Sequence, residues 1–292
     1  MDSELIKIES HQVPILNNRF RLSDYTPGKF NSVFSKKGIK KAIKKGYVSI
    51  NGEIGYTADY IYGGELLELY QPKSPKKRPS ITILLSIIYE DDYLAIINKP
   101  AGILVSGNKK YTLENALATS LTKSKQKDAL FYPEPIHRLD YPTSGAILIG
   151  KTSQAVIFLN KMFEQQKIKK KYKAITIGNQ EENGIIEDPI NEKTSKSEFK
   201  IITSIPSRKY GFLNLVELIP YTGRTHQLRI HMSTIGNPIL GDLKYGKEGL
   251  ISMGNGLYLQ SSNISFIHPF TNNEVEIAIP LPKKFSKMFP NI

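Results

Sequence analysis

Apolar positions between residues 38 and 46 recur at the spacing of a short helix with one buried face. Ile39, Ala42 and Ile43 share that face, and lysines occupy the other sides. Gly46 suits the end of this helix because glycine readily adopts a left-handed backbone. The pattern predicts a brief helix whose outer surface is cationic.

Strand patterns follow this helix. Residues 47–53 predict a strand that ends in an Asn-Gly turn, which is typical of a β-hairpin. A second turn and strand are predicted at residues 63–69. These elements predict a small α+β domain at residues 15–71, with residues 1–14 as a short arm before it.

Residues 72–80 form a predicted linker to a larger domain at residues 81–292. The linker contains three prolines and four cations, which disfavour both helix and sheet and keep a chain extended. In the larger domain, two apolar runs around an acidic turn at residues 81–97 predict a hairpin. The predicted helices are 112–122 with Thr112 as N-cap, 153–166, and one starting near Thr225, while 123–135 and 179–197 are predicted loops.

The charge balance points to a polyanionic partner. The chain carries 40 Lys and Arg residues against 27 Asp and Glu residues, a formal charge of +13. Such an excess favours nucleic acid as the partner. A merely solvated basic surface and an acidic membrane face are the alternatives, but no basic amphipathic helix of membrane-binding length stands out.

Composition also removes several classes of site. The chain has no cysteine, which excludes disulfides, thiolate metal sites and cysteine nucleophiles. The five histidines lack the spacing of a helical metal pair, so no metal site is predicted. No apolar run approaches the ~20 residues that span a bilayer, and the N-terminal sequence lacks signal-peptide features. We therefore expect a cytoplasmic protein without a membrane partner.

Two polar clusters carry the candidate chemistry. In the first, Asp140 lies two residues before Pro142, which cannot donate a backbone hydrogen bond, so strand pairing stops and the carboxylate can enter a cleft. Arg138 would share its face in an extended backbone. Composition alone favours a charged surface turn here. The second cluster crowds donors into eight residues at a predicted helix start, a natural anion site, and comprises Arg224, His226, Gln227, Arg229 and His231.

Both clusters resemble motifs of the RluA-type pseudouridine synthases. Residues 137–145 resemble the family's HRLDxxTSG signature, and residues 223–231 its GRTHQLRxH motif. Three further matches are NKPAG at 98–102, K-x-Y-x-A at 170–174 and G-x-P-I-x-G-D at 236–242. The sequence departs from the family at Leu259-Gln260-Ser261, where Leu-His-Ala is usual.

The resemblance implies an α/β fold of the α+β kind, with a central, mainly antiparallel mixed sheet and an RNA cleft across it. It implies isomerisation of uridine to pseudouridine in RNA, without cofactor or metal. Asp140 falls on the catalytic aspartate, and Tyr172 on a tyrosine that lies against the target uridine. We expect Arg229 to hold the Asp140 carboxylate by a bidentate contact, and Arg224 is the second candidate for this role. Leu228 is expected to form the floor of the uridine pocket.

The same resemblance assigns the remaining polar residues to substrate binding. Arg138 is expected to fill the stack that the flipped uridine leaves. His137 is expected to be a structural or phosphate contact rather than a general base. His226 and Gln227 complete the predicted substrate-binding set.

The small N-terminal domain resembles the S4 RNA-binding module, which places a basic helix before a G-x-V-x-V-N-G strand. Residues 46–52 carry that strand pattern. The basic helix contributes four cations, here called the lysine face: Lys40, Lys41, Lys44 and Lys45. They are expected to contact phosphates. A solvated helix on a small domain is the alternative.

We expect ribosomal RNA of the large subunit as the substrate, in preference to tRNA, because family members with an S4-like module mostly act on it. A monomer is expected. One alternative is a non-catalytic RNA-binding or ribosome-assembly protein on the same scaffold. Another is a hydrolase that uses Asp140 with a histidine, although the chain lacks a serine or cysteine nucleophile motif.

Overall fold

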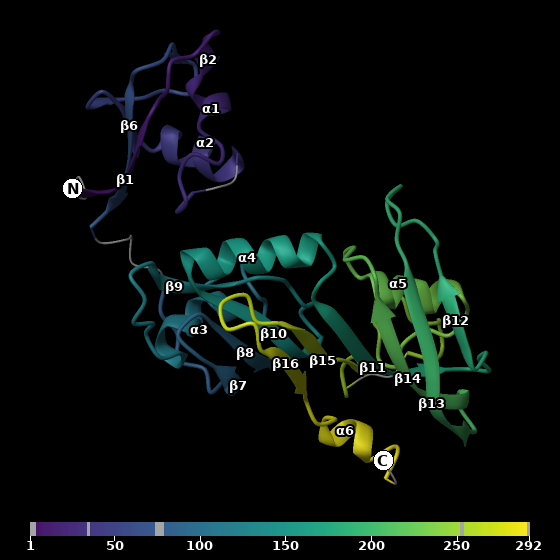
Figure 1. Cartoon of the computed structure of the whole chain (residues 1–292). Coiled ribbons are helices and arrows are strands. Elements are labelled where there is room, and N and C mark those ends of the chain that lie inside the picture. The colour runs from purple at the N-terminus through teal and green to yellow at the C-terminus, as the bar shows by residue number, and fades with distance from the viewer. Residues whose placement is uncertain (1–3, 34–35, 74–78, 252–253, 291–292) are drawn as a thin grey trace. The chain divides into compact units, whose positions relative to one another are not determined.

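The computed structural model describes residues 4–33, 36–73, 79–251 and 254–290 (Figure 1). The chain divides into two compact units, Met1–Arg78 and Pro79–Ile292. The division falls inside the linker expected at residues 72–80, of which 74–78 lie outside the described residues. No helix among the described residues is long and apolar enough to cross a membrane.

The first unit is built on a four-stranded antiparallel sheet. Its strand order is β1-β6-β3-β4, and a two-stranded ladder of β2 and β5 belongs to the same unit. The strands are β1 (Leu5–Gln12), β2 (Phe20–Arg21), β3 (Val48–Ile50), β4 (Glu53–Ile54), β5 (Tyr60–Ile61) and β6 (Leu66–Pro72). The expected arm is therefore wrong in one respect, because β1 pairs with β6 along its whole length and belongs to this sheet.

Helix α2 (Lys36–Lys44) follows the predicted pattern, and a single turn, α1 (Leu22–Tyr25), precedes it. Ile39, Ala42 and Ile43 are buried in the core of this unit together with residues of β3 and β6. All four residues of the lysine face are exposed. The helix thus buries its apolar stripe and leaves its cations in solvent.

The second unit is organised around one large sheet whose path runs β12-β13-β14-β11-β15-β10-β8-β7, with β16 beside β15 and β9 beside β10. Every pair is antiparallel except β10 with β15, so the expected mainly antiparallel mixed sheet is confirmed. The strands are β7 (Ser86–Glu90), β8 (Leu94–Lys99), β9 (Ala129–Pro135), β10 (Ser144–Thr152), β11 (Lys169–Ile177), β12 (Asn183–Ile186), β13 (Ser197–Ser207), β14 (Gly211–Pro220), β15 (Leu259–Ile267) and β16 (Glu274–Ala278).

Both faces of the central strands are buried. Along β8, Ala95 and Ile97 join one apolar core, and Leu94 and Ile96 join a second, as the two-residue period of a strand requires. Helix α4 lies along β9 and β10 and helps to cover the second core (Figure 1). The helices are α3 (Leu113–Ser120), α4 (Ser153–Glu164), α5 (Gln227–Thr234) and α6 (Lys283–Ser286).

Two segments expected to be loops contain strands. Residues 129–135 form β9, which pairs with β10, and residues 183–186 form β12 at the edge of the sheet. Conversely, residues 81–85 precede β7 rather than belonging to the predicted hairpin. The helix at 113–120 is confirmed, and the Thr112 side chain accepts a hydrogen bond from the Asn115 N–H as its N-cap.

Strand β15 lies between β10 and β11 and is their only common neighbour on the path of the sheet. Ser144 and Gly145 pair in parallel with Gln260 and Ser261. Gly145 has a φ of +115°, and a Cβ atom there would lie 2.1 Å from the Ser261 carbonyl oxygen. Only glycine allows β15 to approach the start of β10 this closely.

Candidate active site

Asp140 lies in the loop between β9 and β10. The loop is held by two backbone hydrogen bonds, from the Thr143 N–H to the Asp140 carbonyl at 3.0 Å and from the Gly102 N–H to the Tyr141 carbonyl at 2.8 Å. The Asp140 side chain keeps 17% of its surface exposed. Its carboxylate is therefore fixed in place yet reachable from solvent.

Arg229, in the first turn of α5, is the main cation at this carboxylate. Its Nη1 donates to Asp140 Oδ2 at 3.2 Å. The bidentate contact expected with Asp140 is wrong, because Nε and Nη2 instead donate to the two oxygens of Asp242, at 2.7 and 2.8 Å. Arg229 thus bridges two carboxylates, and its bidentate contact is with Asp242.

Asp242 belongs to this network, although it was not among the site residues predicted from the sequence. It is 1% exposed, and its Oδ1 also accepts the backbone N–H groups of Lys244 and Tyr245. Burial alone would raise the pKa of Asp242, but the hydrogen bond from Arg229 and these two N–H groups outweigh it and hold the pKa below its ordinary value of 3.8. Its place in the G-x-P-I-x-G-D match was the available signal.

His226 brings a third polar group to the site. Its Nε2 lies 3.8 Å from Asp140 Oδ1, and a hydrogen bond of 2.9 Å joins its Nδ1 to the Tyr245 hydroxyl. Burial lowers the pKa of His226, against the opposing pull of the Asp140 carboxylate. The helix does not begin as expected, because His226, with a left-handed φ of +58°, occupies the N-cap position rather than Thr225.

Tyr172 faces the same region from β11. It lies opposite Ser261 of β15 and is 8% exposed. Burial raises the pKa of Tyr172 to about 12, and the nearby Asp140 carboxylate acts in the same direction. The phenol is therefore neutral near pH 7 and keeps its proton as a hydrogen-bond donor.

Lys99, from the NKPAG match, is fully buried beneath the loop that follows β8. Its Nζ donates to the carbonyls of Pro100 and Ile103, both at 2.9 Å. Burial lowers the pKa of Lys99 to about 8, and the Asp140 carboxylate opposes that shift. These contacts turn the ammonium onto the chain's own backbone.

Several predicted substrate-binding residues make contacts within the fold. Gln227 is buried, and its side chain bonds Lys196, Ser197, Thr222 and Arg224 rather than open space. Arg224 Nε donates to the Thr194 carbonyl, away from Asp140. Leu228 is 6% exposed and lies in the same apolar core as Tyr172.

The two residues at the start of the motif point to different surroundings. His137 Nε2 accepts the Leu148 N–H at 3.0 Å, and its ring packs against Phe163. Burial lowers the pKa of His137 to about 3, so the ring is neutral and that nitrogen is already used by the fold. Arg138 is exposed, and its guanidinium makes no hydrogen bond or ion pair among the described residues.

The departure at residues 260 and 261 lies directly beside the site. Gln260 and Ser261 are each 1% exposed. Gln260 Nε2 donates to the Pro280 carbonyl, whereas its Oε1 has no partner within the described chain. Both substitutions are accommodated while β15 keeps its pairing with β10 and β11.

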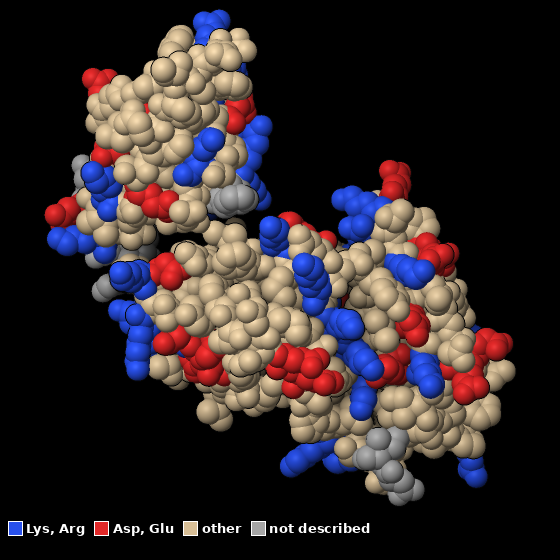
Figure 2. All heavy atoms as spheres, viewed as in Figure 1, with Lys and Arg blue, Asp and Glu red and all other residues tan. Residues whose placement is uncertain are grey.

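The surroundings of the site are basic and offer no metal cage. In the described ranges, no group of three or more His, Asp or Glu side chains could hold a metal ion. Figure 2 shows Lys and Arg side chains gathered in a band on the second unit, near the end of α4 and the start of β11. Exposed cations of that segment are Lys161, Lys167, Lys169 and Lys171.

Comparisons with known proteins show what the chain is similar to. The chain is 30% identical to the ribosomal large subunit pseudouridine synthase C of Vibrio vulnificus, over 88% of each chain. It is 33% identical to the ribosomal large subunit pseudouridine synthase D of Buchnera aphidicola, over 93% of this chain and 94% of that one. The solved structure of human RNA pseudouridylate synthase domain containing 1 shares the fold, with a TM-score of 0.56, 23% identity, and coverage of 72% of this chain and 86% of that one.

The family model of RNA pseudouridylate synthase matches residues 93–234, which include the Asp140 loop, Tyr172 and Arg229. That span runs from the start of β8 to the end of α5, and so contains the strands and the helix that carry these side chains. The chain therefore belongs to the RNA pseudouridylate synthase family and is an isomerase that converts uridine to pseudouridine in RNA.

Proposed function

We propose that this enzyme modifies uridines of large-subunit ribosomal RNA and that Asp140 is its catalytic carboxylate. The observation that carries the proposal is the Asp140 side chain itself, which is fixed by Arg229 at 3.2 Å and still 17% exposed. The names of the relatives support the substrate, because both are large-subunit enzymes that align over most of their length.

The reaction needs a carboxylate at the sugar. The bond between C1′ and N1 of the uracil breaks, the base turns, and a new bond forms between C1′ and C5. The C5 proton leaves to solvent and N1 takes up a proton, so the product is an isomer of the substrate. A carboxylate can serve either by forming an adduct with C1′ or by assisting a glycal intermediate. Either route requires an ionised Asp140 held at a constant position while the base turns.

Arg229 and Tyr172 supply that environment in our proposal. Arg229 is restrained beside Asp140, because Asp242 holds its other two donors. A preorganised guanidinium stabilises charge without reorganising during the reaction. Tyr172 is neutral and buried beside Asp140, and so offers a flat face for the uracil and a proton at its hydroxyl.

The N-terminal unit contributes RNA affinity in this proposal. The lysine face of α2 is exposed along one side of the helix. Cations displayed in this way neutralise phosphates and release counterions, which gives affinity without sequence preference. Arg138, exposed two residues before Asp140, is placed to enter the gap that a flipped uridine leaves.

The decisive experiment is Asp140→Asn, measured on RNA that carries tritium at C5 of uridine. The variant should fold and bind RNA as the parent does or slightly more tightly, because a negative charge near phosphate is gone. Tritium release should fall to background, because an amide can neither attack C1′ nor stabilise charge there. Asp92→Asn is the matched control, since it removes the same charge from a loop in which the side chain accepts the Lys125 N–H.

A folded Asp140→Asn variant that still makes pseudouridine at the parent's rate would refute the catalytic assignment. The substrate is tested separately by mapping pseudouridine in cells that lack the enzyme. We expect sites to disappear from large-subunit ribosomal RNA. Loss of pseudouridine from tRNA alone would refute the proposed substrate without affecting the proposed role of Asp140.

A further inference from the structure

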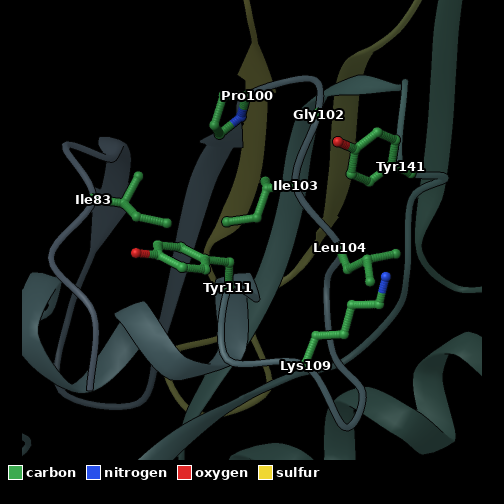
Figure 3. A pocket seen from close by; sticks show the side chains of 8 residues that line it. All are labelled: Ile83, Pro100, Gly102, Ile103, Leu104, Lys109, Tyr111 and Tyr141. Atoms are coloured by element: carbon green, nitrogen blue, oxygen red, sulfur yellow. The ribbon is translucent and has the colours of Figure 1, made fainter. Parts of the chain in front are cut away.

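A cavity of about 710 Å³ opens beside the catalytic loop, and the proposed reaction does not use it. Its apolar part comes from Ile83, Ile103 and Leu104, and its rim from Lys109, Tyr111 and Tyr141 (Figure 3). The volume lies within the range of about 300–1,000 Å³ that is typical of small-molecule sites. A single nucleobase or nucleotide is of that size class.

Two tyrosines give the cavity its character. Tyr111 is 70% exposed and Tyr141 56% exposed, although tyrosine rings usually bury most of their surface. Within the described chain neither phenol hydroxyl has a hydrogen-bond partner. In Figure 3 Ile103 lies between the two rings, Leu104 lies on the side of Tyr141, and Lys109 extends its ammonium toward Leu104.

The cavity is mechanically joined to Asp140. Tyr141 directly follows Asp140 in the chain, and its carbonyl accepts the N–H of Gly102, another residue of the cavity wall. Beneath that wall, Lys99 Nζ holds the carbonyls of Pro100 and Ile103. The position of the cavity relative to the catalytic carboxylate is therefore fixed by hydrogen bonds rather than by a free loop.

We propose that this cavity binds an unstacked base of the substrate RNA, a close neighbour of the uridine that enters the active site. The inference rests on the proposed function and extends it to a second recognition site. Extruding a uridine breaks stacking with its neighbours, and proteins commonly capture splayed bases on aromatic side chains. Tyr111 offers the ring on which the base stacks, and the Tyr141 hydroxyl can read the edge of the base.

Charge favours RNA as the occupant. Lys109 is exposed at the rim, the next residue, Lys110, is also exposed, and the chain as a whole carries +13. A lysine beside an aromatic platform can pair with the phosphate of the same nucleotide while the ring holds its base. The described wall of the cavity contains no acidic residue that would repel a phosphate.

The test compares Tyr111→Ala with Tyr111→Phe in the full chain, and uses Phe212→Ala as the control. Phe212 is an exposed aromatic residue of β14 outside this cavity. The substrate is RNA from cells that lack the enzyme and were grown on uracil tritiated at C5. Tyr111→Ala should raise KM about tenfold, since a base stacked on an aromatic ring contributes that order of affinity. Tyr111→Phe should stay within about threefold of the parent, and Phe212→Ala should match it.

A second measurement does not depend on how the variants fold. The parent protein and the same RNA are cross-linked with ultraviolet light, and nucleotide-bearing peptides are identified by mass spectrometry. We expect a nucleotide attached at Tyr111 or Tyr141. A folded Tyr111→Ala variant with the parent's KM, an equal loss in Phe212→Ala, or the absence of any such cross-link would overturn the proposal.

The outcomes separate this inference from the proposed function. A cross-link at Tyr111 with no tritium release by the parent would support the base site and refute the proposed reaction. Normal tritium release by the parent together with an unchanged KM in Tyr111→Ala would support the proposed reaction and refute the base site. A cavity that instead received a protein partner would leave turnover of purified RNA unchanged in Tyr111→Ala, which again overturns the proposal.

Discussion

Replacing Asp242 with asparagine tests whether Arg229 is positioned by its second carboxylate. The side chains of Asp242 and Arg229 are 1% and 7% exposed, so their contact is nearly dry. In Asp242→Asn one oxygen can still accept the N–H groups of Lys244 and Tyr245. The other oxygen, Oδ2, becomes an NH₂ group, which faces the Arg229 Nε–H that was previously bonded to it at 2.7 Å.

The magnitude follows from that geometry. Removing one member of a buried ion pair typically costs about 3–5 kcal/mol, because the remaining charge stays desolvated. Asp140 still accepts one bond from Arg229, so we expect the lower end, about 3 kcal/mol. In a domain of about 200 residues that corresponds to a melting temperature lower by about 6–12 °C. Turnover should fall by about a hundredfold, because displacing a preorganised donor costs that much in other enzymes.

The assay combines thermal unfolding, RNA affinity and tritium release on one preparation at a temperature where the variant is folded. The matched control is Glu90→Gln, which breaks the ion pair with Lys151, whose side chain is 3% exposed. Lys151 lies near the far end of β10 from Ser144, about 23 Å away by strand rise. Glu90→Gln should lose stability without losing turnover, and a folded Asp242→Asn with the parent's turnover would refute the positioning role.

The acid dependence of stability supplies an independent check on Asp242. Its folded-state pKa is lowered, so the stability it contributes is complete above about 3.8 and is lost as the pH falls through the folded-state value. The difference in unfolding free energy between the parent and Asp242→Asn should therefore be constant near pH 7 and shrink only below about pH 4. A difference that shrank between about pH 5 and 8 would point to another titrating group.

Two further predictions concern the frame of the site and its hold on RNA. Gly145→Ala should destabilise the protein by about 1–3 kcal/mol more than Gly107→Ala, as measured by chemical denaturation. Both glycines have a positive φ, but Gly107 has open space around it, whereas a Cβ at Gly145 would meet Ser261. Equal losses of stability would show that β15 can move aside. Changing the lysine face to glutamines should flatten the plot of log affinity against log salt by about 0.7–0.9 for each phosphate that the lysines no longer neutralise, and an unchanged slope would show that α2 does not touch RNA.

Local signals allowed part of this fold to be predicted from the sequence. The N-cap of α3 involves residues three apart, Thr112 and Asn115, and could be predicted from their spacing. Strand β1 could not, because its status depends on β6, whose Pro72 pairs with Leu5. The strand β9 was hidden for the same reason, since its polar, proline-flanked sequence becomes a strand only by pairing with β10.

The site divides in the same way. The motifs placed Asp140 and Arg229 in two separate clusters, and only the family resemblance put them at one site. The structure brings them within hydrogen-bonding distance. The sequence could not show which carboxylate makes the bidentate contact with Arg229, because Asp140 and Asp242 reach Arg229 from loops that lie far apart in the sequence. The left-handed start of α5 was likewise hidden, since His226 is tied to Tyr245, a residue 19 positions further along the chain.

The place of β15 has a consequence for the order in which this enzyme is made. Strands β7 to β10 form one part of the sheet, and Asp140 lies just before β10. Strands β11 to β14 form the other part, with Tyr172 on β11, and Arg229 lies in helix α5 after β14. Among the described strands, the two parts are joined along the ladder only through β15. As the chain leaves the ribosome, both parts emerge before β15, which leaves one edge of β11 and the start of β10 unpaired. Only when residues 259–267 have emerged can these edges close, so we expect the active site to assemble late in synthesis and the nascent enzyme to stay inactive until then.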